Sequence, residues 1–185
     1  TATSGSISET GPLTVKGTST FAVGIAGSDI LLASQANNFA TVAVGGTATN
    51  VRDFALRNIS NTATVPVLTA LTNLRNLTLS FDTAALSVPA ITTTNVGSVS
   101  LTSGSTVGQT GLISTPTLTT SSVGGTTLGN TQVSGFNATN ATGGVISLTN
   151  TATTLSITGI AQNGAAAGSH MSVNNTGAIS TLTDP

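Results

Sequence analysis

One short pattern recurs along the whole chain: an apolar residue, a small or polar residue, and a second apolar residue. It appears as LTV at Leu13, VAV at Val42, LTL at Leu77, VSL at Val99 and ISL at Ile146. Alternation of this kind is typical of a β-strand that buries one face. Segments rich in Gly, Asn, Ser and Thr separate the triplets and have the chemistry of turns, whereas helical spacing with caps is nowhere convincing. The sequence therefore predicts an all-β protein.

The triplets align at a spacing in the low to middle twenties. Thr78 and Ser100 are the centres of two triplets one such unit apart, Ser147 and Ser172 are another such pair, and the gap between Ser100 and Ser147 is close to two units. A unit of this length is too short to fold alone, but it fits one coil of a β-solenoid. We therefore expect one β-solenoid over residues 1–185, with coils of about 20–25 residues. An antiparallel β-sandwich built from the same strands is the alternative.

Repetition is weakest between residues 104 and 140. Pro116 and several glycines blur the alternating pattern there. Because Pro and Gly punctuate regular structure, we expect irregular coils or a protruding excursion in this region.

The tail, residues 168–185, contains the chain's only histidine, His170, and its only methionine, Met171, within the tetrapeptide GSHM. A cleaved affinity tag commonly leaves this tetrapeptide, but at an amino terminus, so a separate or engineered strand is the less favoured interpretation. Met171 falls on an apolar position of the repeat, which predicts a natural rung of the solenoid with His170 facing solvent. A lone histidine without cysteine or a neighbouring acid builds neither a closed zinc site nor a catalytic triad.

The composition excludes several classes of function. The 185 residues include only nine charged ones, with a net charge of −1, and no Cys, Trp or Tyr. A nucleic-acid partner and membrane insertion are therefore not expected, and disulfides and thiolate metal sites are excluded. A hydrophobic share of 38% argues against a disordered chain. Scarce charge also suits stacked coils, because like charges would repel one strand spacing away, ~4.8 Å.

Three aspartates are spaced so that stacked coils could bring their carboxylates together. Asp29, Asp53 and Asp82 follow one another at intervals close to the expected coil length. Clustered carboxylates serve polysaccharide-cleaving enzymes and calcium sites. Arginines follow similar spacings, so we expect surface ion pairs instead, and we predict no catalytic residue, metal site or cofactor. These arginines are Arg52, Arg57 and Arg75.

Five asparagines lie in the N-x-S/T triplets that are acceptors for N-glycosylation. Such triplets also arise by chance in a chain rich in Asn, Ser and Thr, where Asn serves turns and ladders. Thr-x-Thr patterns suggest an ice-binding face, but the threonines do not recur at one fixed coil position, so ordinary outward strand positions are favoured. The candidate glycosylation sites are Asn58, Asn76, Asn137, Asn140 and Asn174.

Residues 5–56 contain a longer sequence motif than simple alternation. It runs I-x-x-x-G-x-L-T-V-x-G from Ile7 to Gly17, then D-I-x-L from Asp29, N-x-F ending at Phe39, V-x-V from Val42, and D-x-A-L from Asp53. This motif resembles the repeats of filamentous-haemagglutinin-like exoproteins, the large passengers of bacterial two-partner secretion. The resemblance implies a right-handed parallel β-helix, secreted across an outer membrane, and a scaffold repeat with no catalytic residues to transfer.

Composition and resemblance together lead to one functional hypothesis. We expect a non-enzymatic segment of an extracellular, cell-surface exoprotein that acts as a stiff spacer or as a weak multivalent binding surface. Its partners would be glycans or proteins of a host or cell surface, or further copies of itself. The alternatives are a self-assembling filament or surface-layer subunit that uses strand donation and, less favoured, a carbohydrate-active β-helix enzyme.

Overall fold

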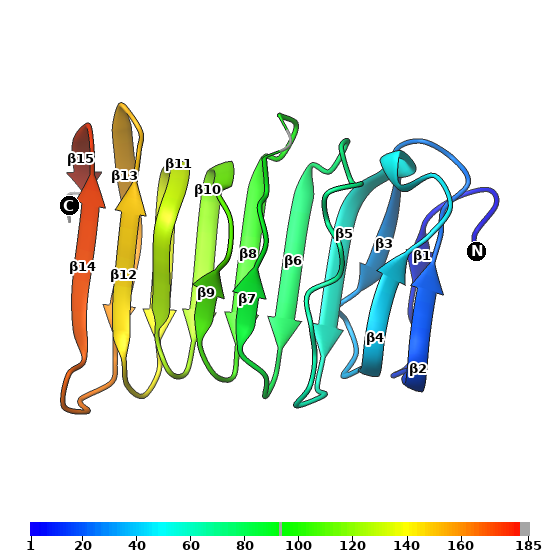
Figure 1. Cartoon of the computed structure of the whole chain (residues 1–185), viewed down its shortest axis with the longest axis horizontal. Coiled ribbons are helices and arrows are strands. Elements are labelled where there is room, and N and C mark those ends of the chain that lie inside the picture. The colour runs from blue at the N-terminus through cyan, green and yellow to red at the C-terminus, as the bar shows by residue number, and fades with distance from the viewer. Residues whose placement is uncertain (93, 182–185) are drawn as a thin grey trace.

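The computed structural model has the predicted β-solenoid architecture, with strands stacked side by side along the long axis of the molecule (Figure 1). It describes residues 1–92 and 94–181. Thirteen strands form one sheet and two more, β2 and β4, form a second. The ladders between named strands of the described chain are parallel, which excludes the antiparallel β-sandwich. The strands are β1 (Ile7–Ser8), β2 (Thr14–Phe21), β3 (Ser28–Leu32), β4 (Asn38–Val44), β5 (Val51–Asn58), β6 (Asn76–Phe81), β7 (Leu86–Val88), β8 (Ser98–Ser103), β9 (Val107–Gln109), β10 (Ile113–Ser122), β11 (Thr126–Asn140), β12 (Val145–Asn150), β13 (Thr154–Gln162), β14 (His170–Asn175) and β15 (Ala178–Thr181), with one 3₁₀ turn, η1 (Ala48–Asn50).

One column of paired residues runs the full length of the rod, and each step along it is one coil. The steps give about eight coils and are unequal: the shortest joins Leu118 to Phe136, and the last, from Ile157 to Thr181, is among the longest. At ~4.8 Å per strand spacing, the eight steps span ~38 Å. The members of the column are Ile7, Ile30, Phe54, Leu77, Val99, Leu118, Phe136, Ile157 and Thr181.

The coils between residues 104 and 140, where irregular coils or a protruding excursion are expected, are the shortest ones. This region contains the long strands β10 and β11, which pair in register from Ile113 to Ser122. Pro116 sits exposed within β10, and the ladder is paired on either side of it. Gly125, at φ +112°, closes the tight turn between the two strands. Gly125 therefore forms a corner between two paired strands.

The internal alignment predicted from the sequence joins two different sides of the solenoid. Thr78 and Ser100 are paired neighbours on one side, which we call the main face: the column side formed by β3, β5, β6, β8, β10, the second half of β11, and β13. Ser147 and Ser172 are paired neighbours on the opposite side, formed by β7, β9, the first half of β11, β12 and β14. The long gap between Ser100 and Ser147 is therefore not two coils. Both sides alternate in the same way, so the pattern alone does not separate them.

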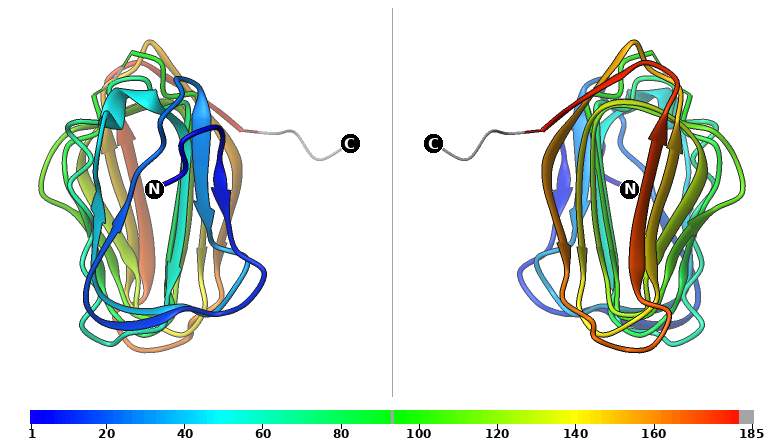
Figure 2. Two further views of the ribbon diagram at one scale, coloured as in Figure 1. Left: turned by 90° about the vertical axis from the view of Figure 1, so that its right-hand side faces the viewer. Right: turned by 90° about the vertical axis from the view of Figure 1, so that its left-hand side faces the viewer.

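The interior of the solenoid is narrow and apolar. The view down the rod shows a flattened ring whose two long sides are strands (Figure 2). Its largest fully buried side chains include four of the five phenylalanines, and Leu, Ile, Val and Ala occupy most of the remaining inward positions, beside a smaller number of buried Asn, Ser and Thr side chains. Their burial is the main stabilising contribution in a chain without disulfides. These phenylalanines are Phe39, Phe54, Phe81 and Phe136.

Asparagine side chains stabilise three corners, at the ends of β5, β12 and β14. Asn58, Asn150 and Asn175 are each the last residue of their strand, and each side chain pairs with the backbone N–H and C=O of one residue about a coil earlier. Asn150 accepts from the Val133 N–H at 2.8 Å and donates to its carbonyl at 2.9 Å. Asn58 does the same with Phe39, and Asn175 with Ala152, at 3.0 to 3.1 Å. Each amide thus replaces a missing strand neighbour.

The tail joins the solenoid as its last described rung. His170 pairs with Val145 and Met171 with Ile146, in the register predicted from their positions. His170 is exposed, and its Nδ1 lies 2.9 Å from the Gly168 carbonyl oxygen. Residues 182–185 lie outside the described chain.

Candidate functional site

The outward positions of the main face form ranks of small polar side chains. One column runs through Thr78, Ser100, Thr119 and Asn137, which pair directly from coil to coil. A second column runs two residues further along each strand, through Ser80, Thr102, Ser121 and Thr139. Polar side chains thus recur at fixed coil positions. Threonine alone does not: each column mixes Thr with Ser, and one also contains Asn.

The arginines and aspartates of the described chain form ion pairs on the first coils of this face. Arg52 holds Asp29 with two hydrogen bonds, Nε to Oδ1 at 3.0 Å and Nη2 to Oδ2 at 2.7 Å. Asp53 lies between two arginines, with Oδ2 3.3 Å from Arg52 Nε and 3.4 Å from Arg75 Nη2. The pKa of Arg52 is raised above its ordinary value, mainly by its hydrogen bonds with Asp29 and next by the negative charge of Asp29. The expected ion pairs are therefore present.

Asp82 lies at the far end of the strands from the other two aspartates. Asp53 pairs with Asn76 at the start of β6, and Asp82 follows the end of that strand. The length of β6 separates these levels, ~20 Å. The three-carboxylate column considered from the spacing is not assembled. Within residues 1–92 and 94–181, no group of three His, Cys, Asp or Glu side chains is placed to hold a metal ion.

Asp82 instead closes one end of a shallow open groove. Arg57 donates to it from Nη2 to Oδ2 at 2.6 Å and from Nε to Oδ1 at 3.0 Å, and these bonds raise the pKa of Arg57. The groove, of about 480 Å³, continues along the hydroxyls of the second column. Hydroxyl groups line it beside the apolar side chains of Val123 and Ala141, and Phe81 beneath it is fully buried. The groove was not predictable from the sequence, because its residues come from several coils.

The candidate glycosylation sites differ in how exposed their side chains are. Asn58 and Asn140 are 2% and 0% exposed, because they occupy inward positions at strand ends. Asn76 is engaged in a polar ladder: it donates to Asp53 at 2.9 Å and accepts from Ser98 at 2.7 Å. Asn137 is half-buried on the main face and Asn174 is exposed on β14. Among the five, Asn174 alone has an exposed side chain on the folded chain.

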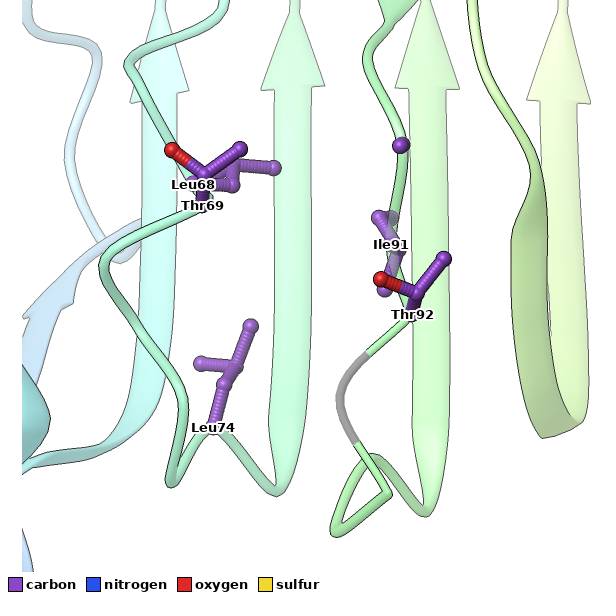
Figure 3. Close-up of a pocket in the computed structure, with 6 residues that line it drawn as sticks. Leu68, Thr69, Leu74, Ile91 and Thr92 are labelled. Carbon is purple, nitrogen blue, oxygen red and sulfur yellow. The ribbon is translucent and has the colours of Figure 1, made fainter.

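A small, partly open pocket lies where two coils run without regular strands. Leu68 and Leu74 from one coil and Ile91 from the next line a cavity of about 90 Å³ (Figure 3). Thr69 and Thr92 lie at its rim. Apolar walls and small volume make this a packing gap between irregular segments.

Comparison with known proteins supports the repetitive nature of the chain. A family model described as "Repeats of unknown function (DUF5649)" matches residues 1–45, about a quarter of the length. No curated protein and no solved structure matches the chain. In the described residues, no helix is long and apolar enough to cross a membrane.

Proposed function

We propose that this chain is a stiff segment of a secreted bacterial surface exoprotein that spaces and presents weak, multivalent contacts. The observation that carries the proposal is the unbroken column of paired strands from Ile7 to Thr181. Each coil is hydrogen-bonded to the next, so the chain is a rod whose length is set by the number of its coils.

The main face supports the contact role. It presents a small polar side chain, a hydroxyl in most coils, at the same positions of successive coils, so a partner with its own repeat could engage several coils at once. Weak single contacts become strong when several form together. A glycan or a protein loop at a cell surface would meet donors and acceptors with little charge beyond the first coils.

The resemblance to filamentous-haemagglutinin-like repeats supports an extracellular location. The segment that carries it, residues 5–56, overlaps residues 1–45, which the repeat family matches. In the structure these residues form the first coils, and their apolar positions Ile30, Phe39 and Val42 are buried. The motif is therefore scaffold, as the resemblance implies, and the exposed residues set what the segment contacts.

Binding of the chain to cells tests the contact role. The chain displayed in many copies on beads should bind cell or glycan surfaces, and Ser100→Lys with Thr119→Lys on the main face should weaken binding at least about tenfold by breaking the repeat. Thr127→Lys, an exposed position on the opposite side, is the matched control. Equal binding by both variants would sink the contact role. Antibody labelling of intact source cells tests the location, and unlabelled cells would contradict it.

A further inference from the structure

A single Asn-Gly dipeptide occurs in the chain, Asn163-Gly164, and it lies at a corner of the solenoid. It comes directly after β13, and neither residue belongs to a strand. The Asn163 backbone N–H donates to the Asn140 carbonyl at 2.9 Å, which holds the corner against the preceding coil. The Asn163 side chain is exposed, so its amide group is accessible to water.

This exposure belongs to the place of Asn163 in the coil and does not depend on where the described chain ends. Ala141 occupies the same place one coil earlier, because it follows β11 as Asn163 follows β13. Its N–H donates to Ser122, the last residue of the neighbouring strand, in the same way. Ala141 is exposed although the coil that contains Asn163 is stacked on it. A further coil would therefore leave the Asn163 side chain in solvent.

Glycine is required at position 164 by packing. A Cβ atom there would collide with the backbone of Thr142 and Gly143 in the preceding coil, which cannot move aside as a flexible side chain would. The Gly164 N–H donates no backbone hydrogen bond in the described residues, so its nitrogen is not held in a ladder. Without a Cβ beside it, this nitrogen is open to close approach by the side chain that precedes it. The fold thus places an unhindered backbone nitrogen next to an exposed asparagine amide.

We propose that Asn163-Gly164 is a site of spontaneous deamidation, with water as the co-reactant. The Gly164 nitrogen attacks Cγ of Asn163, and its proton leaves with the side-chain nitrogen as ammonia, which closes a cyclic imide. Water then cleaves one of the two bonds between the imide nitrogen and a carbonyl carbon. Cleavage at Cγ gives aspartate, and cleavage at the backbone carbonyl carbon gives isoaspartate. Either product adds a negative charge to residues 83–181, which contain no Lys, Arg, Asp or Glu.

The isoaspartate product changes the backbone of the corner as well as its charge. Its main chain runs through Cβ and Cγ of residue 163 and is therefore one atom longer before the Gly164 nitrogen. Asn163 is held by a hydrogen bond to Asn140, and Gly164 lies directly against the Thr142 backbone. A longer link between these two points cannot maintain both contacts. We therefore expect isoaspartate to loosen this corner and the chain that leads from it into β14.

Ageing of the full chain in mildly alkaline buffer, followed by peptide mass spectrometry and isoelectric focusing, tests the site. Asn163 should gain about one dalton, and the chain should become one charge more negative. Isoaspartyl methyltransferase with a labelled methyl donor should label the aged chain. Asn163→Gln should remove all three signals, because the longer side chain closes its ring far more slowly. Asn130 is the matched control: it is exposed in β11, is followed by Thr131, and should stay unchanged.

Two results would overturn the modification site. In the first, Asn163 stays intact in the folded chain while the same chain in guanidinium chloride is converted, which would show that the fold protects it. In the second, Asn130 is converted as fast as Asn163, which would show that Gly164 has no special effect.

Hydrogen exchange of the isolated isoaspartate form tests the loosening of the corner. Amides between residue 163 and β14 should exchange faster in this form than in Asn163→Asp, which adds the charge without lengthening the backbone. Equal exchange in the two would overturn the loosening. Deamidation does not depend on cell binding, so this inference and the proposed function can each fail alone.

Discussion

Replacing Asn150 by alanine removes a brace that the backbone cannot replace. The side chain is 2% exposed and makes four hydrogen bonds: with the N–H and C=O of Val133, with the Thr131 hydroxyl and with the Asn175 side chain. Without it, both backbone groups of Val133, itself 1% exposed, lose the partner that Asn150 supplies. Each buried unpaired group costs about 1–3 kcal/mol, so we expect a loss of about 2–6 kcal/mol in the free energy of unfolding.

Urea unfolding followed by far-ultraviolet circular dichroism measures this loss. The matched control is Asn130→Ala, an exposed asparagine in β11, which should change the free energy of unfolding by less than about 0.5 kcal/mol. Asn58→Ala removes the same type of brace from Phe39 and should behave like Asn150→Ala. A loss below about 1 kcal/mol at both brace positions would refute the argument, since the corner would then be held by strand pairing alone.

Three further changes test the core, the corners and the ion pairs. Phe136→Ala, at a fully buried ring, should lower the free energy of unfolding by about 3–5 kcal/mol in the same assay. Gly144→Ala should destabilise by about 1–3 kcal/mol, because φ is +82° and a Cβ would collide with the Gly124 carbonyl, while Gly129→Ala has open space and should be nearly neutral; equal melting temperatures would contradict this. Asp82→Asn should cost no more than about 1 kcal/mol and less in high salt. Because Asp82 raises the pKa of Arg57, their pairing is fully present below the ordinary arginine pKa and is lost only above it, so this contribution should stay constant between about pH 7 and about pH 10.

The sequence predicted the class of fold because two periods were visible at once. Alternation identified the strands, and the spacing of Thr78 and Ser100 matched a real coil step. It did not predict the path of the chain around the coil, because the opposite sides use the same alternation and the coil shortens between Leu118 and Phe136. Positions at a fixed spacing along the sequence therefore start on one side of the solenoid and, after the shorter coils, fall on the opposite side.

The ion pairs were predictable and the braces were not. Asp29 and Arg52 are separated by about one coil, so the coil length alone placed them together. Asn150 stands where alternation calls for an apolar residue, two positions after Leu148, and Asn58 likewise follows Leu56. That break in the pattern was the available signal. In a chain with so many asparagines it was not distinguishable from turn chemistry.

The uneven length of the coils has a consequence for how such a chain can change over time. The short coil from Leu118 to Phe136 and the longer one from Ile157 to Thr181 maintain the same column of strands. Residues can therefore be gained or lost at the corners and in the segments outside the strands without moving the strands of the main face. Selection can then preserve the stacked column while the spacing between repeats wanders. An alignment of relatives by a fixed repeat length would lose the correct register after a few coils. An alignment by stacked position would keep it.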